Sequence, residues 1–554
     1  MSHQRIPRRP QWPLLAILFL GVIAIAALAF ILTNPLDSSP EEQREQRYVE
    51  AIVGSPDRVT PLFAPLNEAD ADLASLVFSG LTRLGPEGRV LPDLAESWEV
   101  SPDGLIYTFK LRRDVNWHTG PAFTAEDAVF TYELLADPEL PSDPRLGELW
   151  RQVSCDSPDE FTLLCELSEP FAPFLSFTTI GILPKHVLEG MTAVDIFASP
   201  FNQAPVGTGP FRLATLNEAE AILRANPTYY GEPPAIDEIE IRFYPDPSTA
   251  AVALSRGEVQ GLLLLGPDAD QEDFDLLTST GGLRAYTSNR TLILMLFLNN
   301  SQPPFDDMAL REAVALSVNV DDVISDLLGG RAVRADSPIV PGTWAYNPQL
   351  KPRPHDLDAA RQLLEEAGWE MTDAGVRQKD GKEMRISLLT DQDPLRIAIA
   401  QTIANQLAEV GIQVAVTPQD SDLRREFLAT HQYQAAIFGW DPGADPDPYL
   451  VWHSSQVESP DDGNIAGYQN EDADRVIEEA RQTTDLDKRQ TLYYTFQQKF
   501  LEDVPSVLLY YPVFTYFVAE EVQNIELGTL FQTSSRFANV IQWTMGESPE
   551  LLDD

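Results

Sequence analysis

Hydrophobic and polar residues alternate along several short stretches of this chain, and each such stretch predicts a half-buried β-strand. The clearest is 107–112, where aromatic and aliphatic residues alternate with Thr, Lys and Arg. Just before it, 101–104 reads Ser-Pro-Asp-Gly, with a turn-forming residue at every position, so this region predicts a β-hairpin. Further strands are predicted at 48–53, 236–244, 412–416 and 507–511.

Other segments repeat their apolar residues every three to four positions, which is typical of helices that pack one face on a core. Three of these helices are expected to begin at Thr124, Asp356 and Asn470, whose side chains favour a helix N-terminus. Gly368 and Gly411 are well placed to end two of them. The expected helices span 125–135, 357–367, 397–410, a stretch after Asn470, and 486–502. Helices that alternate with strands in this way indicate a mixed α/β architecture.

The N-terminal region has a different pattern. Several arginines precede residues 13–32, which contain no charged side chain and as a helix would span about 30 Å, the thickness of a bilayer core. Because positive charge stays on the cytoplasmic side, we expect 1–12 to be a cytoplasmic tail, 13–32 a membrane anchor and the body extracytoplasmic. A cleaved signal peptide is the alternative, since 27–29 (Ala-Leu-Ala) is a usable cleavage site. Residues 33–47 are polar and contain proline, as a linker would.

Length and charge narrow the class of protein. The 554 residues are too many for one hydrophobic core, so two or three lobes are expected. The formal net charge of −46 would repel nucleic acid and anionic headgroups, which makes both poor partners. Acidic surfaces keep proteins soluble, and we expect a monomer; a field that attracts the ligand is the alternative interpretation.

The chain has two cysteines, Cys155 and Cys165, which flank a Ser-Pro-Asp-Glu turn. They lie on the two strands of an expected hairpin, so in an oxidising compartment we expect a disulfide. A pair of buried free thiols is the alternative. No histidine or further cysteine is near them in sequence, so we expect neither a zinc site nor any other cofactor.

Several segments match one protein family in order and spacing. They include Pro-Val-Gly-Thr-Gly-Pro-Phe at 205–211 and Gly-Trp followed by Ala-Asp-Pro-Asp-Pro at 439–448. The full set is 93–112 continued by 115–120, 205–213, 298–300, 304–319, 357–369, 439–448, 467–489 and 503–507. Together they resemble the family 5 extracellular solute-binding proteins, the dipeptide, oligopeptide and nickel receptors that feed ABC importers. The resemblance covers roughly residues 48–545.

The resemblance implies an α/β fold of the two-lobed periplasmic-binding-protein-like kind (type II, class C), with an extra subdomain inserted in the first lobe. The implied boundaries are 48–270 for lobe 1, including the subdomain at about 73–200, then 271–482 for lobe 2, 483–545 for a return to lobe 1, and 546–554 for a tail. The hinge crossings should lie near 263–283 and 480–485. Closure of the lobes would bury the ligand and signal occupancy to the importer.

In peptide-binding relatives the loop after Gly-Trp holds the ligand, and the resemblance carries this role to Trp440 and Asp445. Trp440 would pack beside the ligand. Asp445 would accept its α-amino group, because a buried ammonium needs a carboxylate partner. Phe438 and Gly439 are expected to pair with the main chain of a peptide.

The length of this loop differs from the family pattern, so Asp441 and Asp447 are alternatives to Asp445. A solvated, proline-rich turn is the non-functional interpretation. Arg331 and Arg334 are candidates for binding a ligand carboxylate, and a plain surface role is the alternative for both.

We therefore expect a receptor without catalytic role that delivers di- or oligopeptides to the permease subunits of an ABC importer and is held at the membrane by its N-terminal helix. A nickel-chelate, oligosaccharide or opine receptor on the same fold is the main alternative. A ligand-sensing domain that signals through the N-terminal helix is another. A secreted hydrolase is disfavoured, because neither Gly-x-Ser-x-Gly nor His-Glu-x-x-His occurs.

Overall fold

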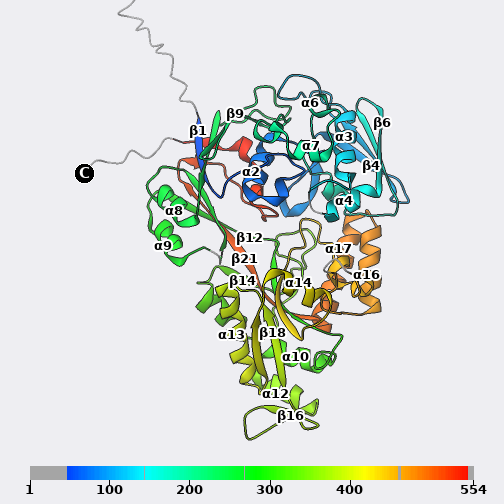
Figure 1. The fold of residues 1–554 in the computed structure, drawn as a ribbon, viewed down its shortest axis with the longest axis vertical. Coiled ribbons are helices and arrows are strands. Elements are labelled where there is room, and N and C mark those ends of the chain that lie inside the picture. Colours follow the sequence, from blue (N-terminus) through cyan, green and yellow to red (C-terminus); the bar gives the residue numbers. More distant parts are fainter. Residues whose placement is uncertain (1–45, 142–143, 267–268, 460–462, 547–554) are drawn as a thin grey trace, which may run out of the picture. The chain divides into compact units, whose positions relative to one another are not determined.

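The computed structural model describes residues 46–141, 144–266, 269–459 and 463–546, and the described residues from Arg47 to Gly546 belong to one compact unit (Figure 1). Its main sheet has twelve strands in the order β19-β18-β20-β13-β21-β11-β1-β10-β9-β8, with β12 and β14 also paired to β21. In chain order these strands are β1 (Arg47–Val53), β8 (Phe211–Leu216), β9 (Glu220–Ala225), β10 (Glu238–Tyr244), β11 (Gly261–Leu264), β12 (Leu283–Asn289), β13 (Ile293–Leu298), β14 (Ala332–Arg334), β18 (Arg385–Thr390), β19 (Gln413–Pro418), β20 (Ala435–Trp440) and β21 (Ser506–Ala519).

The longest strand, β21, belongs to two parts of this sheet. Its first residues pair with β13 and its last residues pair with β11 and β12. We call the part built on β1 and β8–β12 lobe 1, and the part built on β13, β14 and β18–β20 lobe 2. Each lobe buries its own side chains, and β21 contributes to both: Tyr516 packs in a core of lobe 1 and Leu509 in a core of lobe 2.

Lobe 1 carries a second sheet of four strands in the order β4-β5-β7-β6. β4 (Ala95–Val100) and β5 (Ile106–Leu111) form the predicted hairpin, and Gly104, at a φ of +73°, donates its N–H to Ser101 O at 2.8 Å. In β6 (Val153–Asp159) and β7 (Thr162–Leu167), Cys155 lies directly opposite Cys165, and a disulfide joins them. The predicted hairpin and the predicted disulfide are both confirmed.

The helices of lobe 1 lie between and around these strands. They are α2 (Glu68–Val77), α3 (Ala125–Ala136), α4 (Pro144–Arg151), α5 (Phe174–Phe177), α6 (Lys185–Leu188), α7 (Ala193–Phe197), α8 (Pro247–Ser255) and α9 (Gln271–Ser279). Two of them share a core, since Leu254 of α8 and Leu277 of α9 are buried together with Leu262 of β11. Short strands β2 (Thr82–Leu84), β3 (Val90–Pro92), β22 (Val522–Gln523) and β23 (Thr544–Met545) complete this part.

Lobe 2 contains α10 (Met308–Ser317), α11 (Val320–Asp322), α12 (Leu357–Glu366), α13 (Pro394–Ala408), α14 (Ser421–Ala429), α15 (Tyr449–Trp452), α16 (Glu471–Gln482) and α17 (Leu486–Asp503), with a small sheet of β15 (Glu370–Met371), β16 (Arg377–Lys379) and β17 (Lys382–Glu383). The predicted N-caps are confirmed: Asp356 accepts from Ala359 N at 3.0 Å and Asn470 from Asp472 N at 2.9 Å. Gly368, at a φ of +83°, follows α12 as predicted. These ends are local features, which explains why the sequence predicts them.

The chain passes between the lobes at two places that differ from the expected crossings. It leaves lobe 1 in the link 290–292 between β12 and β13, and it returns within β21. The expected crossing at 263–283 includes α9, which packs in lobe 1. The expected crossing at 480–485 is the turn between α16 and α17, and both helices pack on the lobe 2 core, Ile477 and Phe496 being buried there. The apolar pattern of β21 is that of any buried strand, although the strand packs in two cores. The sequence therefore does not predict that the chain crosses between the lobes within β21.

Within the described ranges, no helix combines the length and the apolar composition that crossing a bilayer requires. The expected tail at 1–12, the expected anchor at 13–32, nearly all of the linker at 33–47 and the tail at 547–554 lie outside the described residues.

Candidate ligand-binding site

The predicted ligand loop begins at the end of β20. Phe438 and Gly439 pair with Met295 and Leu294 of β13, whereas the pairing of β20 with β18 ends at Ala436. Beyond Ala436, the edge of β20 that faces away from β13 is therefore no longer paired with β18. An extended peptide adds to a sheet at such an edge through main-chain hydrogen bonds.

Trp440, the last residue of β20, packs mainly on protein. Its side chain is 8% exposed and lies edge-on to Trp452, with the ring centroids 5.8 Å apart. Trp452 in turn stacks on Phe297 of β13. Trp440 thus fixes the start of the loop on the lobe 2 core, and only a small part of its surface remains for a ligand.

Asp445 is held by an arginine of α17. Arg489 donates from both terminal nitrogens to the two carboxylate oxygens, at 2.8 and 2.7 Å. The Arg489 side chain is 5% exposed and that of Asp445 is 12% exposed. Arg489 also donates to Ala480 O at 3.0 Å and to the Tyr493 hydroxyl at 3.0 Å. Two parallel hydrogen bonds between a guanidinium and a carboxylate fix the relative orientation of the two groups.

Electrostatics reinforce this pairing. Burial alone would lower the pKa of Arg489, but the Asp445 carboxylate and the hydrogen bonds to Asp445 and Tyr493 raise that pKa above its usual value. A ligand ammonium at Asp445 would have to compete with a guanidinium that is already fixed in place. Both carboxylate oxygens of Asp445 already accept from Arg489, so an α-amino group at Asp445 would share that carboxylate with Arg489 or displace it.

The two alternative aspartates also have partners. Asp447 pairs with Arg481 at 3.3 Å, and its burial raises its pKa while Arg481 lowers it. Asp441, which is exposed, accepts from the Thr291 hydroxyl at 2.6 Å and from Gly443 N at 2.9 Å. Thr291 belongs to the link between the lobes, so Asp441 lies beside a hinge segment.

The two arginines proposed for a ligand carboxylate are engaged as well. Arg334 forms an ion pair with Asp321 at 2.8 Å and donates to Arg353 O. Arg331 donates to Gln271 Oε1 of α9 at 3.1 Å, which connects lobe 2 to lobe 1. Both guanidinium groups therefore already have partners within the protein in this conformation.

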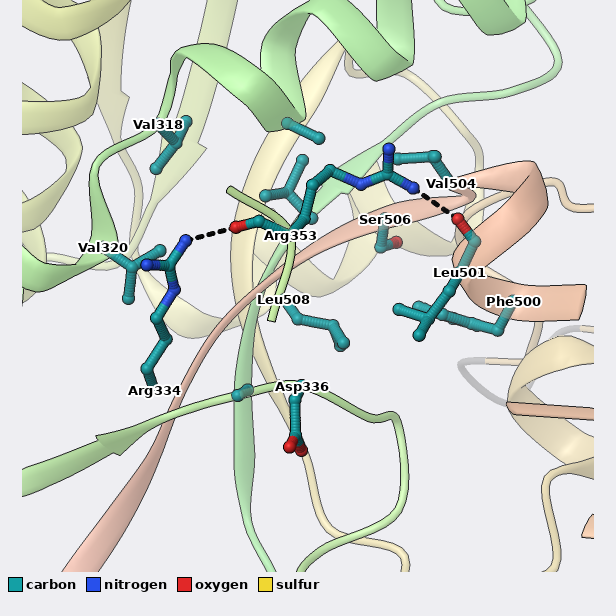
Figure 2. A pocket seen from close by; sticks show the side chains of 13 residues that line it. Val318, Val320, Arg334, Asp336, Arg353, Phe500, Leu501, Val504, Ser506 and Leu508 are labelled. Atoms are coloured by element: carbon teal, nitrogen blue, oxygen red, sulfur yellow. Dashed lines mark hydrogen bonds between the residues drawn. The ribbon is translucent and has the colours of Figure 1, made fainter. Parts of the chain in front are cut away.

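Arg334 and Arg353 line a narrow cavity in lobe 2, together with Asp336 and Ser506 (Figure 2). Figure 2 shows Arg353 extended across its upper side, with a hydrogen bond to Leu501 O. The cavity has a volume of about 30 Å³. One water needs roughly 10–15 Å³ of such volume, so this space suits water and is too small for a peptide or a chelate.

A larger cavity of about 170 Å³ lies in lobe 1. Its walls include Val53 at the end of β1 and Leu264 at the end of β11, two parallel neighbours in the sheet. In open α/β sheets, ligands bind beyond the carboxyl ends of parallel strands. Glu68 and Asp72 of α2, with Thr533 and Arg536, supply the polar part of the wall, and the rest is aliphatic.

A buried charged network forms the floor of this cavity. Arg536 donates to Glu50 at 2.7 Å and to Asp72 at 2.6 Å, and the Thr533 hydroxyl donates to Asp72 at 3.0 Å. Glu50 also accepts from the Tyr516 hydroxyl at 2.8 Å. Burial raises the pKa of Glu50, and the Arg536 guanidinium opposes that shift. The network is internally satisfied, so it shapes the cavity rather than offering a free charge.

Glu68 differs from its neighbours in the cavity wall. It is exposed, and no described residue hydrogen-bonds to its carboxylate or forms an ion pair with it. Partial burial raises its pKa, and the nearby Arg290 guanidinium opposes that shift. Nothing in the sequence singles out Glu68, because acidic residues after Asn67 are ordinary for a helix N-terminus. A wall residue of this kind becomes apparent only when the cavity is seen.

Comparison with known proteins places the chain in one family. Residues 89–461 match the bacterial extracellular solute-binding proteins, family 5 middle. The oligopeptide-binding protein AppA of Bacillus subtilis is 27% identical over 493 residues, which cover 86% of this chain and 88% of AppA. The nickel-binding periplasmic protein of Escherichia coli is 29% identical over 475 residues, which cover 82% of this chain and 86% of that protein.

The solved structure of Bacillus subtilis AppA in complex with a nonapeptide is similar throughout. It has a TM-score of 0.67 and 25% sequence identity, with 91% of this chain and 100% of that chain covered. The fold is therefore the two-lobed, α/β, type II periplasmic-binding-protein fold that the sequence predicts. The chain belongs to the bacterial extracellular solute-binding proteins of family 5.

Proposed function

We propose that this protein is the extracytoplasmic receptor of an ABC importer and that it captures di- or oligopeptides between its two lobes, without a catalytic role. The family membership supports an extracytoplasmic solute receptor. The peptide assignment is supported by relatives named for peptides, such as AppA and the di/tripeptide-binding protein 2 of Pseudomonas aeruginosa, which is 27% identical over 461 residues and covers 79% of this chain and 84% of that protein.

The observation that carries the proposal is the hinge. The lobes are joined by the link 290–292 and by β21, and one candidate ligand group lies at that link: Asp441 accepts a hydrogen bond from Thr291. The Arg290 guanidinium of the same link lowers the pKa of Glu68 against the raising effect of its burial. A ligand that contacts both lobes binds the closed arrangement more tightly than an open one, and this difference in affinity shifts the equilibrium toward closure.

Contacts across the lobes define the conformation described here. Trp344 N donates to Glu87 O at 2.8 Å, and Ala172 N donates to Arg481 O at 2.8 Å. The Arg481 guanidinium of lobe 2 also lies 4.9 Å from the centre of the Phe171 ring of lobe 1. Opening would break these contacts, so we infer that this is a closed state and that release of solute requires their rupture.

Within this function we assign roles to the loop residues. Phe438 and Gly439 offer the strand edge that pairs with the main chain of a peptide, and Asp441 offers an exposed carboxylate beside it. Trp440 fixes the loop and presents a small apolar surface. Asp445 keeps Arg489 in place. We further propose that residues 13–32 are retained as a membrane anchor, which membrane fractionation of the full-length chain tests directly.

A thermal-shift screen of the full-length chain in mild detergent tests the function. A ligand at 100 times its Kd stabilises the folded state by about 2.7 kcal/mol, which is a measurable rise in Tm. We expect peptides to give such a rise. If no peptide of any length does so, while a nickel–histidine chelate or an oligosaccharide does, the peptide assignment is wrong and the receptor fold serves another solute.

A further inference from the structure

We propose that the lobe 1 cavity binds the cationic end of the ligand and that Glu68 is the carboxylate that receives its ammonium group. This inference rests on the proposed peptide function and names the group that determines specificity. The ligand class is a peptide with a free amino group and a small aliphatic terminal residue.

The size and walls of the cavity fit such a group. Its volume of about 170 Å³ is well above that of the water-sized cavity in lobe 2 and below the ~300–1,000 Å³ typical of a site that encloses a whole drug-sized ligand. It therefore suits one end of a ligand. Ile52, Leu263 and Pro247 are among its apolar walls, and such walls can bury an aliphatic terminal side chain.

The charges in the wall leave one carboxylate in excess. Three charged residues line the cavity: Glu68, Asp72 and Arg536. Asp72 and Arg536 are bonded to each other at 2.6 Å, and Glu50 beneath them is bonded to the same Arg536. Glu68 alone has no bonded partner among the described residues. Two guanidinium groups lower the pKa of Glu68 without bonding to it: Arg290, which does not line the cavity, and Arg536, which is already bonded to Asp72 and Glu50.

The aspartate that the family resemblance designates is occupied in this chain. Accepting an ammonium at Asp445 would displace Arg489, which is 5% exposed, from a two-pronged pair. A buried guanidinium without its counter-ion is strongly destabilising. Glu68 requires no such displacement, because no protein cation is bonded to it.

The test uses native mass spectrometry of the full-length chain with two synthetic tripeptide libraries, one with free N-termini and one N-acetylated on the same sequences. Wild-type protein is expected to retain members of the free library at least tenfold more strongly than their acetylated forms. Glu68→Gln is expected to abolish that preference, because a charge-assisted hydrogen bond exceeds a neutral one by about 1.4 kcal/mol, which is tenfold in affinity. Glu232→Gln, which removes the same charge at an exposed site away from the cavity, is expected to keep it.

The outcomes separate the two levels of the argument. If neither library binds, the peptide function itself fails and this inference fails with it. If peptides bind and Glu68→Gln keeps the preference for a free N-terminus, the inference alone is overturned. The same holds if Asp445→Asn abolishes the preference without lowering Tm. Acetylated peptides that contain lysine show whether a side-chain ammonium also binds Glu68. Strong retention of these peptides by the wild type that is lost in Glu68→Gln supports binding of an ammonium group at Glu68.

Discussion

The pair between Asp445 and Arg489 gives the sharpest prediction, because it distinguishes a structural aspartate from a ligand-binding one. Asp445→Asn keeps the shape of the side chain but turns one of its two acceptor atoms into a donor that faces the guanidinium. Arg489 would keep its bonds to Ala480 O and Tyr493. It would lose the charge partner that holds it at 5% exposure.

The expected cost follows from the burial of the pair. Breaking a buried ion pair by removing one partner costs roughly 3–5 kcal/mol, and the two surviving bonds of Arg489 favour the lower value, about 3 kcal/mol. For a cooperative unit of 150–250 residues each kcal/mol shifts Tm by about 2–4 °C. If lobe 2 unfolds as a unit of that size, Tm should fall by about 6–12 °C.

Differential scanning calorimetry of the full-length variant measures this shift. Asp447→Asn is the matched control in the same loop. Its partner Arg481 is 29% exposed and the pair is single and longer, at 3.3 Å, so a loss of about 1 kcal/mol is expected. Normal Tm for Asp445→Asn combined with lost peptide binding would refute the reasoning, because Asp445 would then serve the ligand.

Three further perturbations test other parts of the account. Arg536→Met should lower the free energy of unfolding in urea by about 3–5 kcal/mol, because Glu50 and Asp72 lose their counter-ion inside the protein. The control Arg224→Met, at a side chain that is 68% exposed, should change it by less than about 0.5 kcal/mol. Equal effects of the two substitutions would contradict the role given to the buried charges. Burial raises the pKa of Asp93 to about 6, so the protonated carboxyl group stabilises the folded state fully below about pH 4, and this stabilisation is lost as the pH rises through about 6. Asp93→Asn should therefore reduce the fall of Tm between about pH 4 and about pH 6. An unchanged dependence of Tm on pH would contradict the role given to Asp93. Reducing the Cys155–Cys165 disulfide, which closes a loop of 10 residues, should lower the free energy of unfolding of the part of lobe 1 that contains β6 and β7 by about 2–3 kcal/mol, and Cys155→Ser should show the same loss without reductant.

The sequence predicts those parts of the fold that depend on near neighbours. Ser101 to Gly104 form their turn within four residues, Asn470 caps α16 within three, and Cys155 meets Cys165 across one hairpin. Each of these features is determined by local backbone geometry and by side chains a few positions apart. The order of the family-like segments adds the two-lobed topology that local patterns do not contain.

The candidate site depends on residues that are far apart in the chain. Arg489 lies 44 positions from Asp445, and Arg536 lies 486 positions from Glu50. No periodicity or motif links such partners, so the sequence indicates the acidic loop but not that its carboxylates are already paired. The crossing within β21 cannot be predicted from the sequence for the same reason. The two ends of β21 pack in different cores because one end pairs with β13 and the other with β11, and both partners are distant in the chain.

The most direct test of the central claim is native mass spectrometry of the protein purified from its own cells without added ligand. We expect a bound species whose mass and fragmentation are those of short peptides, released when the protein is unfolded and retained when it is folded. A folded protein that carries a nickel chelate, an opine or a sugar instead, in the presence of cellular peptides, would contradict it.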